Sequence, residues 1–142
     1  MNNAEDYRKK LMAMGFDELE ITASSPEEAK KVLAEMRQRQ KELRQLKSML
    51  NLDMKTIRND YEQKKQGAGE GGFALIGLFG KRGLATQHRA NAKRQINAKR
   101  DQELRPYQNI KMTIDDLLLQ IDQIKIQFQQ YIDEKKAEQK NQ

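Results

Sequence analysis

The apolar positions in the last third of the chain follow a coiled-coil spacing. From Tyr107 onwards, large apolar residues are separated alternately by three and four positions. Such spacing places one apolar stripe along a helix that packs against another helix. The stripe, which we call the seam, predicts a coiled-coil-type helix and a candidate assembly surface. Its residues are Tyr107, Ile110, Ile114, Leu117, Ile121, Ile124, Phe128 and Tyr131.

Two further helices are predicted before the seam. Ser25-Pro26-Glu27-Glu28 combines an N-cap serine, a proline at the first helical position and a following glutamate. Apolar residues then recur at sevens with a slow drift, and no helix breaker precedes Gly67, which predicts a helix over residues 26–66. Near the amino terminus, Asn3 can cap a short helix over residues 3–14 that stops at Gly15.

The glycines predict where the chain turns. Residues 67–83 hold seven of the eight glycines, and the chain beyond them contains no glycine. The fold class is therefore all-α: a single domain over residues 1–142, formed by a long antiparallel helical hairpin with arms 26–66 and 84–138. The short amino-terminal helix lies near the open end of the hairpin, and a Gly-rich apolar loop forms its tip. The second arm is expected to bend or break near Pro106.

The second arm is the longer one, so its end near Phe128 and Ile132 should overhang the first arm. The amino-terminal helix is the expected cover for this end. It would pack there through Tyr7, Leu11 and Met14.

A basic stripe replaces the seam between the turn and Pro106. Extending the seam backward meets Arg100, Ile96 and Lys93, and the four bases of the stripe are Arg82, Arg89, Lys93 and Arg100. With the turn centred near residue 75, Asp60 would lie opposite Ala90 and Asp53 opposite Asn97, so the bases could pair within the hairpin. Alternatively, the excess of bases is a candidate surface for an anionic partner.

The glycine-rich tip carries its own candidate site. An apolar loop with two adjacent bases suits docking to a protein, shallow insertion into an anionic bilayer, or burial within this protein. The loop residues are Phe73, Leu75, Ile76, Leu78, Phe79, Lys81 and Arg82.

A second stripe lies on the same helix as the seam. Met112, Leu119 and Ile126 repeat every seven residues and point away from the seam. An exposed apolar row is unfavourable in water, so we expect the amino-terminal helix or another copy of the protein to cover it. The alternative is that these are three isolated surface residues.

Composition excludes several function classes. The chain of 142 residues is 34% charged and 37% apolar, with no Cys and one His. Thiolate zinc sites and Cys-His nucleophile pairs are therefore impossible. Gly67 to Gly72 match G-x-G-x-x-G but follow a helical pattern rather than a strand, and His88 has no carboxylate at helical spacing to orient it. We expect no enzyme activity, no cofactor, no metal and no small-molecule substrate.

These patterns together favour a non-enzymatic protein-protein interaction or scaffold protein. It would form a homo-oligomer through the seam half and dock an unidentified protein through the tip and the basic arm. The alternative is a peripheral membrane protein that inserts the Phe73 to Phe79 loop. Nucleic-acid binding by the basic arm comes third, because residues 85–105 contain no aromatic side chain to stack on a base. The amino terminus lacks an apolar signal core, so a cytoplasmic location is expected, with a membrane surface as the alternative.

Overall fold

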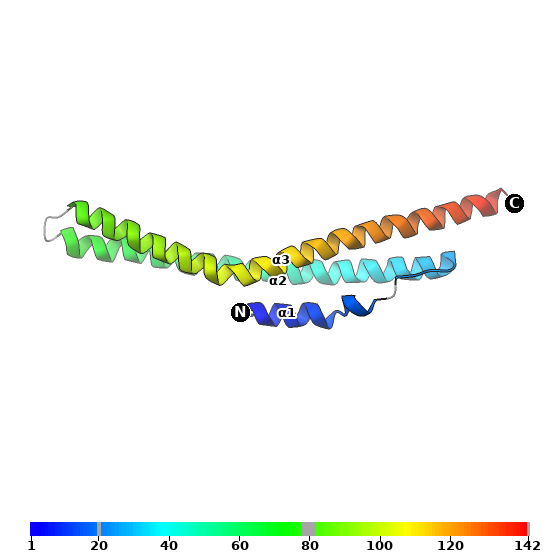
Figure 1. The fold of residues 1–142 in the computed structure, drawn as a ribbon, viewed down its shortest axis with the longest axis horizontal. Coiled ribbons are helices and arrows are strands. Elements are labelled where there is room, and N and C mark those ends of the chain that lie inside the picture. The colour runs from blue at the N-terminus through cyan, green and yellow to red at the C-terminus, as the bar shows by residue number, and fades with distance from the viewer. Residues whose placement is uncertain (20, 78–81, 142) are drawn as a thin grey trace. The chain divides into compact units, whose positions relative to one another are not determined.

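Among the residues that it describes, the computed structural model has helices as its only regular secondary structure. It describes the backbone of residues 1–19, 21–77 and 82–141, and the side chains of these residues outside 67–86 and 88. The elements are α1 (Ala4–Ala13), the short 3-10 helix η1 (Phe16–Glu18), α2 (Pro26–Gly77) and α3 (Arg82–Lys140). Helices α2 and α3 pack against each other as an antiparallel hairpin (Figure 1). The predicted all-α hairpin with a short amino-terminal helix is confirmed.

The chain divides into two compact units. Unit 1 consists of residues 1–50 and 110–142, and unit 2 consists of residues 51–109. Each unit contains a stretch of α2 and a stretch of α3, and unit 1 also contains α1 and η1.

Both predicted helix starts are capped as their sequences indicate. Asn3 and Asp6 form a reciprocal capping box at α1, with bonds of 3.0 and 2.8 Å between each side chain and the other residue's backbone N–H. At α2, the backbone N–H of Glu28 donates to Ser25 Oγ at 3.2 Å. Gly15 adopts a left-handed φ of 68° after α1, a conformation that favours glycine, and so ends the helix.

The core of unit 1 is built from the apolar stripes of α2 and α3. Ile114 and Ile121 of the seam are buried, and the other seam residues in this unit are partly buried. Tyr7 adds the one buried side chain of α1. The buried residues of α2 in this unit include Leu33, Met36, Leu43, Leu46 and Leu50. The seam is therefore covered within a single chain.

As far as its side chains are described, the core of unit 2 is much smaller. Its buried side chains among the described residues are Met54, Ile57, Leu104 and Tyr107. Residues of α3 nearer the tip, such as Ile96 and Arg100, are only partly buried. This thinning follows from the sequence, because bases replace apolar residues along the seam line.

Both long helices extend further than the sequence suggested. Helix α2 continues through the first glycines to Gly77, and α3 begins at Arg82, whereas arms of 26–66 and 84–138 around a loop over 67–83 were expected. A glycine in a helix costs about 1 kcal/mol relative to alanine but does not forbid the helix. Helix α3 is also continuous through Pro106, so the expected alternative of a break there is wrong.

The longer helices change the pairing of the arms. Tyr61 bonds to Glu103, whereas the expected register placed Asp60 opposite Ala90. That register assumed a turn centred near residue 75, whereas α2 itself extends to Gly77. The expected pairing of Asp60 and Asp53 with the bases near Ala90 and Asn97 is therefore wrong.

The carboxyl end of the seam is covered differently from expectation. Ile132 packs with Ala29 and Leu33 at the start of α2, joined by Ala23, Phe128 and Tyr131. With the observed register, this part of α3 lies beside α2 instead of overhanging it. The first turns of α2 and the segment before them, rather than α1, provide the cover.

Candidate protein-interaction surface

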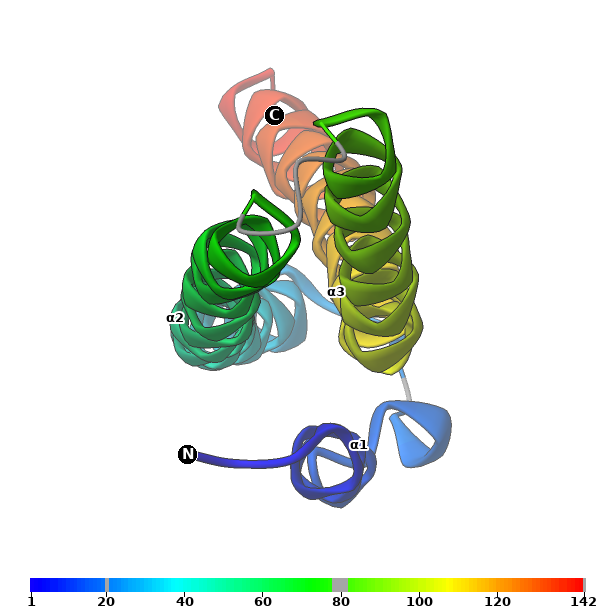
Figure 2. The same cartoon turned by 90° about the vertical axis from the view of Figure 1, so that its left-hand side faces the viewer.

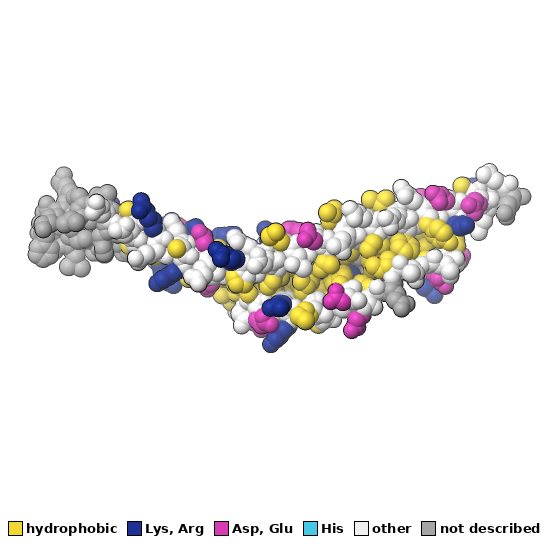
Figure 3. All heavy atoms as spheres, in the orientation of Figure 1, with side chains coloured by type: hydrophobic (Ala, Val, Ile, Leu, Met, Phe, Trp, Pro, Cys, Tyr) yellow, Lys and Arg dark blue, Asp and Glu magenta, His cyan; other side chains and the backbone are white. Residues whose placement is uncertain are grey.

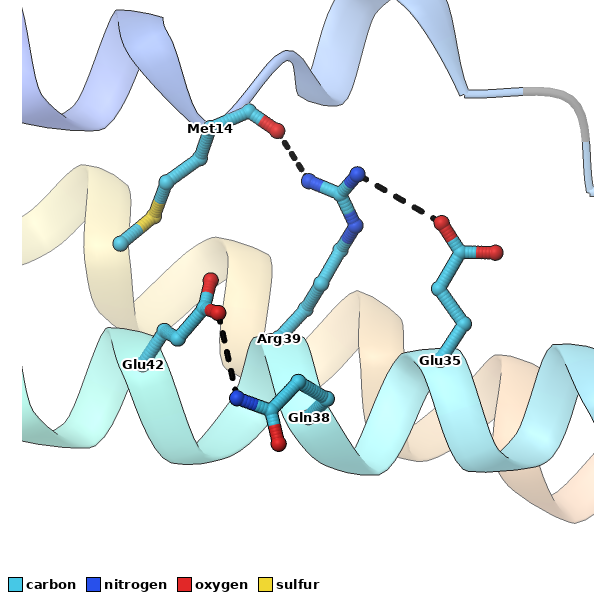
Figure 4. A network of polar contacts seen from close by, with 5 residues as sticks. All are labelled: Met14, Glu35, Gln38, Arg39 and Glu42. Atoms are coloured by element: carbon cyan, nitrogen blue, oxygen red, sulfur yellow. Dashed lines mark hydrogen bonds and ion pairs between the residues drawn. The ribbon is translucent and has the colours of Figure 1, made fainter.

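Helix α1 and the segment that follows it are attached to one side of the hairpin. Arg39 Nη1 donates to the carbonyl of Met14, and Nη2 lies 3.5 Å from Glu35 Oε1 (Figure 4). The same guanidinium lies 5.3 Å from the centroid of the Phe16 ring. Arg39 therefore holds the end of α1 and the start of η1 against α2.

Residues 16–19 and 21–24, which we call the connector, cover the neighbouring side of α3. A hollow of about 140 Å³ is lined by Phe16, Leu19 and Ile21 on one side and by Leu117 and Ile124 on the other. Figure 3 shows hydrophobic side chains gathered where α3 borders the connector. This side of unit 1 is thus occupied by the chain itself.

The opposite side of α3 carries three exposed apolar side chains. Met112, Leu119 and Ile126 are 65%, 59% and 58% exposed, with α1 and the connector in place. The predicted second stripe does point away from the seam. Helix α1 does not cover it, so that expected occupant is wrong. We call these three residues the apolar row.

A matching row of cations lies on α2. Arg37, Lys41 and Arg44 recur at four and three positions, which places them on one helix face, and all three are exposed. None of them forms an ion pair with a described carboxylate. We call them the basic row. This row is not among the sites predicted above from the sequence, although its spacing could have revealed it.

A groove between α2 and α3 is bordered by one residue of each row, Arg37 and Ile126. Its volume is about 380 Å³, and it is lined by Leu33, Arg37, Asp122, Lys125, Ile126 and Gln129. Arg37 and Arg39 are two positions apart, as are Ile124 and Ile126, and two positions correspond to about 200° around a helix. The groove therefore lies on the side of the hairpin away from α1 and the connector. We call this side, with both rows, the open face of unit 1.

Polar contacts fix the two helices beneath the open face. Buried Gln40 donates to Asp122 Oδ1 at 2.7 Å and accepts from Lys125 Nζ at 2.8 Å. Lys47 forms an ion pair with Asp115 about two turns further along the helices. These contacts pair Asp115 and Asp122 within the chain, whereas exposed Asp116, between Met112 and Leu119, forms no ion pair with a described cation.

The formal net charge of the protein comes entirely from unit 2. Residues 51–109 contain twelve Lys and Arg against six Asp and Glu, which accounts for the net charge of +6. In the predicted basic stripe, Arg100 pairs with neighbouring Asp101 at 3.1 Å, Arg89 is partly buried and Lys93 is exposed. The stripe is thus partly neutralised, by a partner other than the expected Asp60 or Asp53.

Tyr61 joins α2 to α3 within unit 2. Its hydroxyl donates to Glu103 Oε2, and this bond to a carboxylate raises the pKa of Tyr61 above its ordinary value. Lys64 Nζ lies 4.6 Å from the centroid of the same ring. The site is exposed, and its geometry is that of a tether between helices.

The candidate tip site lies outside the described side chains. Leu78, Phe79 and Lys81 fall outside the described residues, and Phe73, Leu75, Ile76 and Arg82 belong to helical stretches whose side chains are not described. The His88 side chain is likewise not described. The tip and the first base of the stripe therefore stay predictions from sequence.

The described residues hold neither a candidate metal cluster nor a helix that could cross a membrane, and the chain matches no known protein to which it was compared. No cluster of three or more His, Cys, Asp or Glu suited to a metal ion is found in the described part of the chain. Within residues 1–19, 21–77 and 82–141, no helix has the length and apolarity needed to cross a membrane. No family model, curated protein or solved structure matches the chain.

Proposed function

We propose that this protein is a non-enzymatic protein-protein interaction or scaffold protein that docks a partner on the open face of unit 1. The observation that carries the proposal is the apolar row. Three large apolar side chains, each more than half exposed, repeat at sevens along α3, and one of them, Ile126, borders a groove. Rows of this kind are covered in helical assemblies, because leaving them in water is unfavourable.

The experiment compares capture of partners from the native host by the protein and by a row variant. In the row variant, Met112, Leu119 and Ile126 are each replaced by Ser. The matched control replaces Met12, which is 72% exposed on α1, by Ser. We expect a partner that the native chain and the control capture and the row variant loses. Equal capture by all three proteins would contradict the proposal.

Self-association is a separate expectation of the same proposal. The seam is covered within one chain, so a homo-oligomer would have to use another surface. Analytical ultracentrifugation at micromolar concentration tests it, and a monomer at that concentration would remove it. Docking through the tip and the basic arm, and action in the cytoplasm, stay proposals that partner capture with tip variants and cell fractionation would test.

A further inference from the structure

We propose that the open face of unit 1 binds an acidic amphipathic helix of another protein. This inference rests on the proposed interaction function and specifies the chemistry of the partner. The face has two halves of different character, the apolar row on α3 and the basic row on α2, and the groove between the helices is bordered by Ile126 of the first row and Arg37 of the second. A helix lying over this face would meet apolar side chains on one flank and cations on the other.

The dimensions of the apolar row suit a helix. Met112, Leu119 and Ile126 are spaced by one heptad each, so the row extends about 21 Å along α3. A partner helix of about three heptads would present its own apolar residues at the same period. The side of the hairpin that carries α1 is already occupied, which leaves the open face for the additional helix (Figure 2).

Charge complementarity selects an acidic partner. Arg37, Lys41 and Arg44 have no described carboxylate to pair with, whereas Asp115 and Asp122 on α3 are held by Lys47 and Gln40. The face therefore presents cations whose charge is not balanced locally. Glu or Asp residues on one flank of the incoming helix would pair with them, while Lys or Arg there would be repelled.

A second copy of the chain fits this face less well. If two open faces met with their apolar rows in contact, their basic rows would also be brought together and would repel. If each α3 instead lay over the other copy's α2, each apolar row would face cations. Neither symmetric arrangement satisfies both rows.

A membrane surface also fits less well than a helix. Interfacial membrane-binding helices bury a broad apolar face, commonly with Trp or Phe. The open face offers Met, Leu and Ile in a single file beside a groove. Such a narrow apolar file matches the apolar stripe of one helix.

The test uses the whole 142-residue chain and labelled synthetic helical peptides of about three heptads. One peptide carries Leu at heptad spacing with Glu on one flank, and its matched partner carries Lys in place of each Glu. Fluorescence anisotropy measures the dissociation constants. We expect the acidic peptide to bind at least about tenfold more tightly than the basic one, with the difference shrinking at high salt.

Variants of the protein locate the binding. Leu119→Glu should weaken the acidic peptide about tenfold or more. The combined reversal Arg37→Glu, Lys41→Glu and Arg44→Glu should make the basic peptide the tighter ligand. The control, Lys9→Glu, Lys10→Glu and Lys31→Glu, changes the net charge equally, at exposed positions away from the open face, and should keep the acidic preference. Circular dichroism verifies that every variant is helical.

Five outcomes would overturn the inference, and the first four concern the peptides and the oligomeric state. The first is that neither peptide binds, and the second is that both bind equally tightly. The third is that the control variant loses the preference for the acidic peptide as completely as the reversal of the basic row does. The fourth is that the protein forms a dimer in ultracentrifugation that Leu119→Glu dissociates. Binding to anionic vesicles that needs Leu119 would also overturn it, in favour of a membrane. If the native host yields a row-dependent partner but the peptides show no acidic preference, the proposed function survives and this inference fails.

Discussion

Gln40 Nε2 donates a hydrogen bond of 2.7 Å to Asp122 Oδ1, which joins α2 to α3 at the one buried polar side chain among the described residues. Lys125 Nζ, on the same face of α3, donates a second hydrogen bond, to Gln40 Oε1. If one helix shifted along the other, these buried polar groups would lose their partners. The contact therefore favours one alignment of the two helices over the shifted ones. It therefore marks the register in which the hairpin of unit 1 pairs.

Replacing the amide by a carboxylate should destabilise this pairing. Gln40→Glu brings a second negative charge to Asp122 in a partly buried place, and we expect the free energy of unfolding to fall by about 1–3 kcal/mol. Urea denaturation measures it. Gln45→Glu, at an exposed position on the same helix, should change stability by no more than about 0.5 kcal/mol. Adding Asp122→Asn should restore part of the loss, and equal effects of Gln40→Glu and Gln45→Glu would contradict this role.

Seam and apolar row should respond differently to the same substitution. Ile114 is fully buried, so Ile114→Ala should lower the free energy of unfolding by about 2–5 kcal/mol through lost burial and a cavity. Leu119→Ala, on the same helix but more than half exposed, should cost no more than about 0.5 kcal/mol. Thermal or chemical unfolding tests the pair. A large loss from Leu119→Ala in a monomeric protein would mean that the open face is covered by the chain itself.

The hairpin could be predicted from sequence because its signals are local and strong. The alternating three-four spacing from Tyr107 specifies one helix face, and the Ser25-Pro26 start specifies where α2 begins. The exposure of Met112, Leu119 and Ile126 followed from the same periodicity, because a second heptad row cannot share the face of the first. These features depend only on neighbours along the helix.

The pairing of the two arms could not be predicted, because it depends on where the helices end. Seven glycines suggested an early stop, yet each disfavours a helix by only about 1 kcal/mol. Once α2 reaches Gly77, each residue of α2 meets a different part of α3, as Tyr61 and Glu103 show. The position of α1 likewise depends on Arg39 and Phe16, a long-range contact with no periodic signal. The spacing of the basic row, which begins at Arg37, is visible in the sequence. Its position next to the apolar row depends on how α2 and α3 pair, which the sequence does not show.

Arg39 should control the attachment of α1. Arg39→Met keeps much of the aliphatic stem but removes the bond to the Met14 carbonyl and the charge above Phe16. We expect local opening of residues 1–24 to become easier by about 1–3 kcal/mol, seen as faster limited proteolysis or amide exchange there. Arg37→Met is the control, because Arg37 faces the open side. Unchanged protection of residues 1–24 in Arg39→Met would exclude this attachment.

The start of α2 should weaken in acid. The backbone N–H and the hydroxyl of Ser24 both donate to Glu28 Oε2. These bonds, the backbone one most strongly, hold the pKa of Glu28 below its ordinary value of 4.5. A lowered pKa in the folded state means that the contribution to stability is present above pH 4.5 and is lost as the pH falls through the folded pKa. The stability difference between the native chain and Glu28→Gln should therefore shrink below pH 4.5. A pH-independent difference would contradict this role of Glu28.

Pro106 lies inside a continuous helix, so its replacement should stabilise the protein. Proline has no backbone N–H, which leaves the carbonyl of Gln102 without its helical donor, and its ring crowds that carbonyl. Pro106→Ala should raise the free energy of unfolding by up to about 3 kcal/mol, measured by chemical denaturation. Its side chain is exposed, so little packing is lost in exchange. The control is Gln108→Ala, an exposed position on the same helix, where the change should be small. Loss of stability in Pro106→Ala would mean that unit 2 depends on a distortion that only proline imposes.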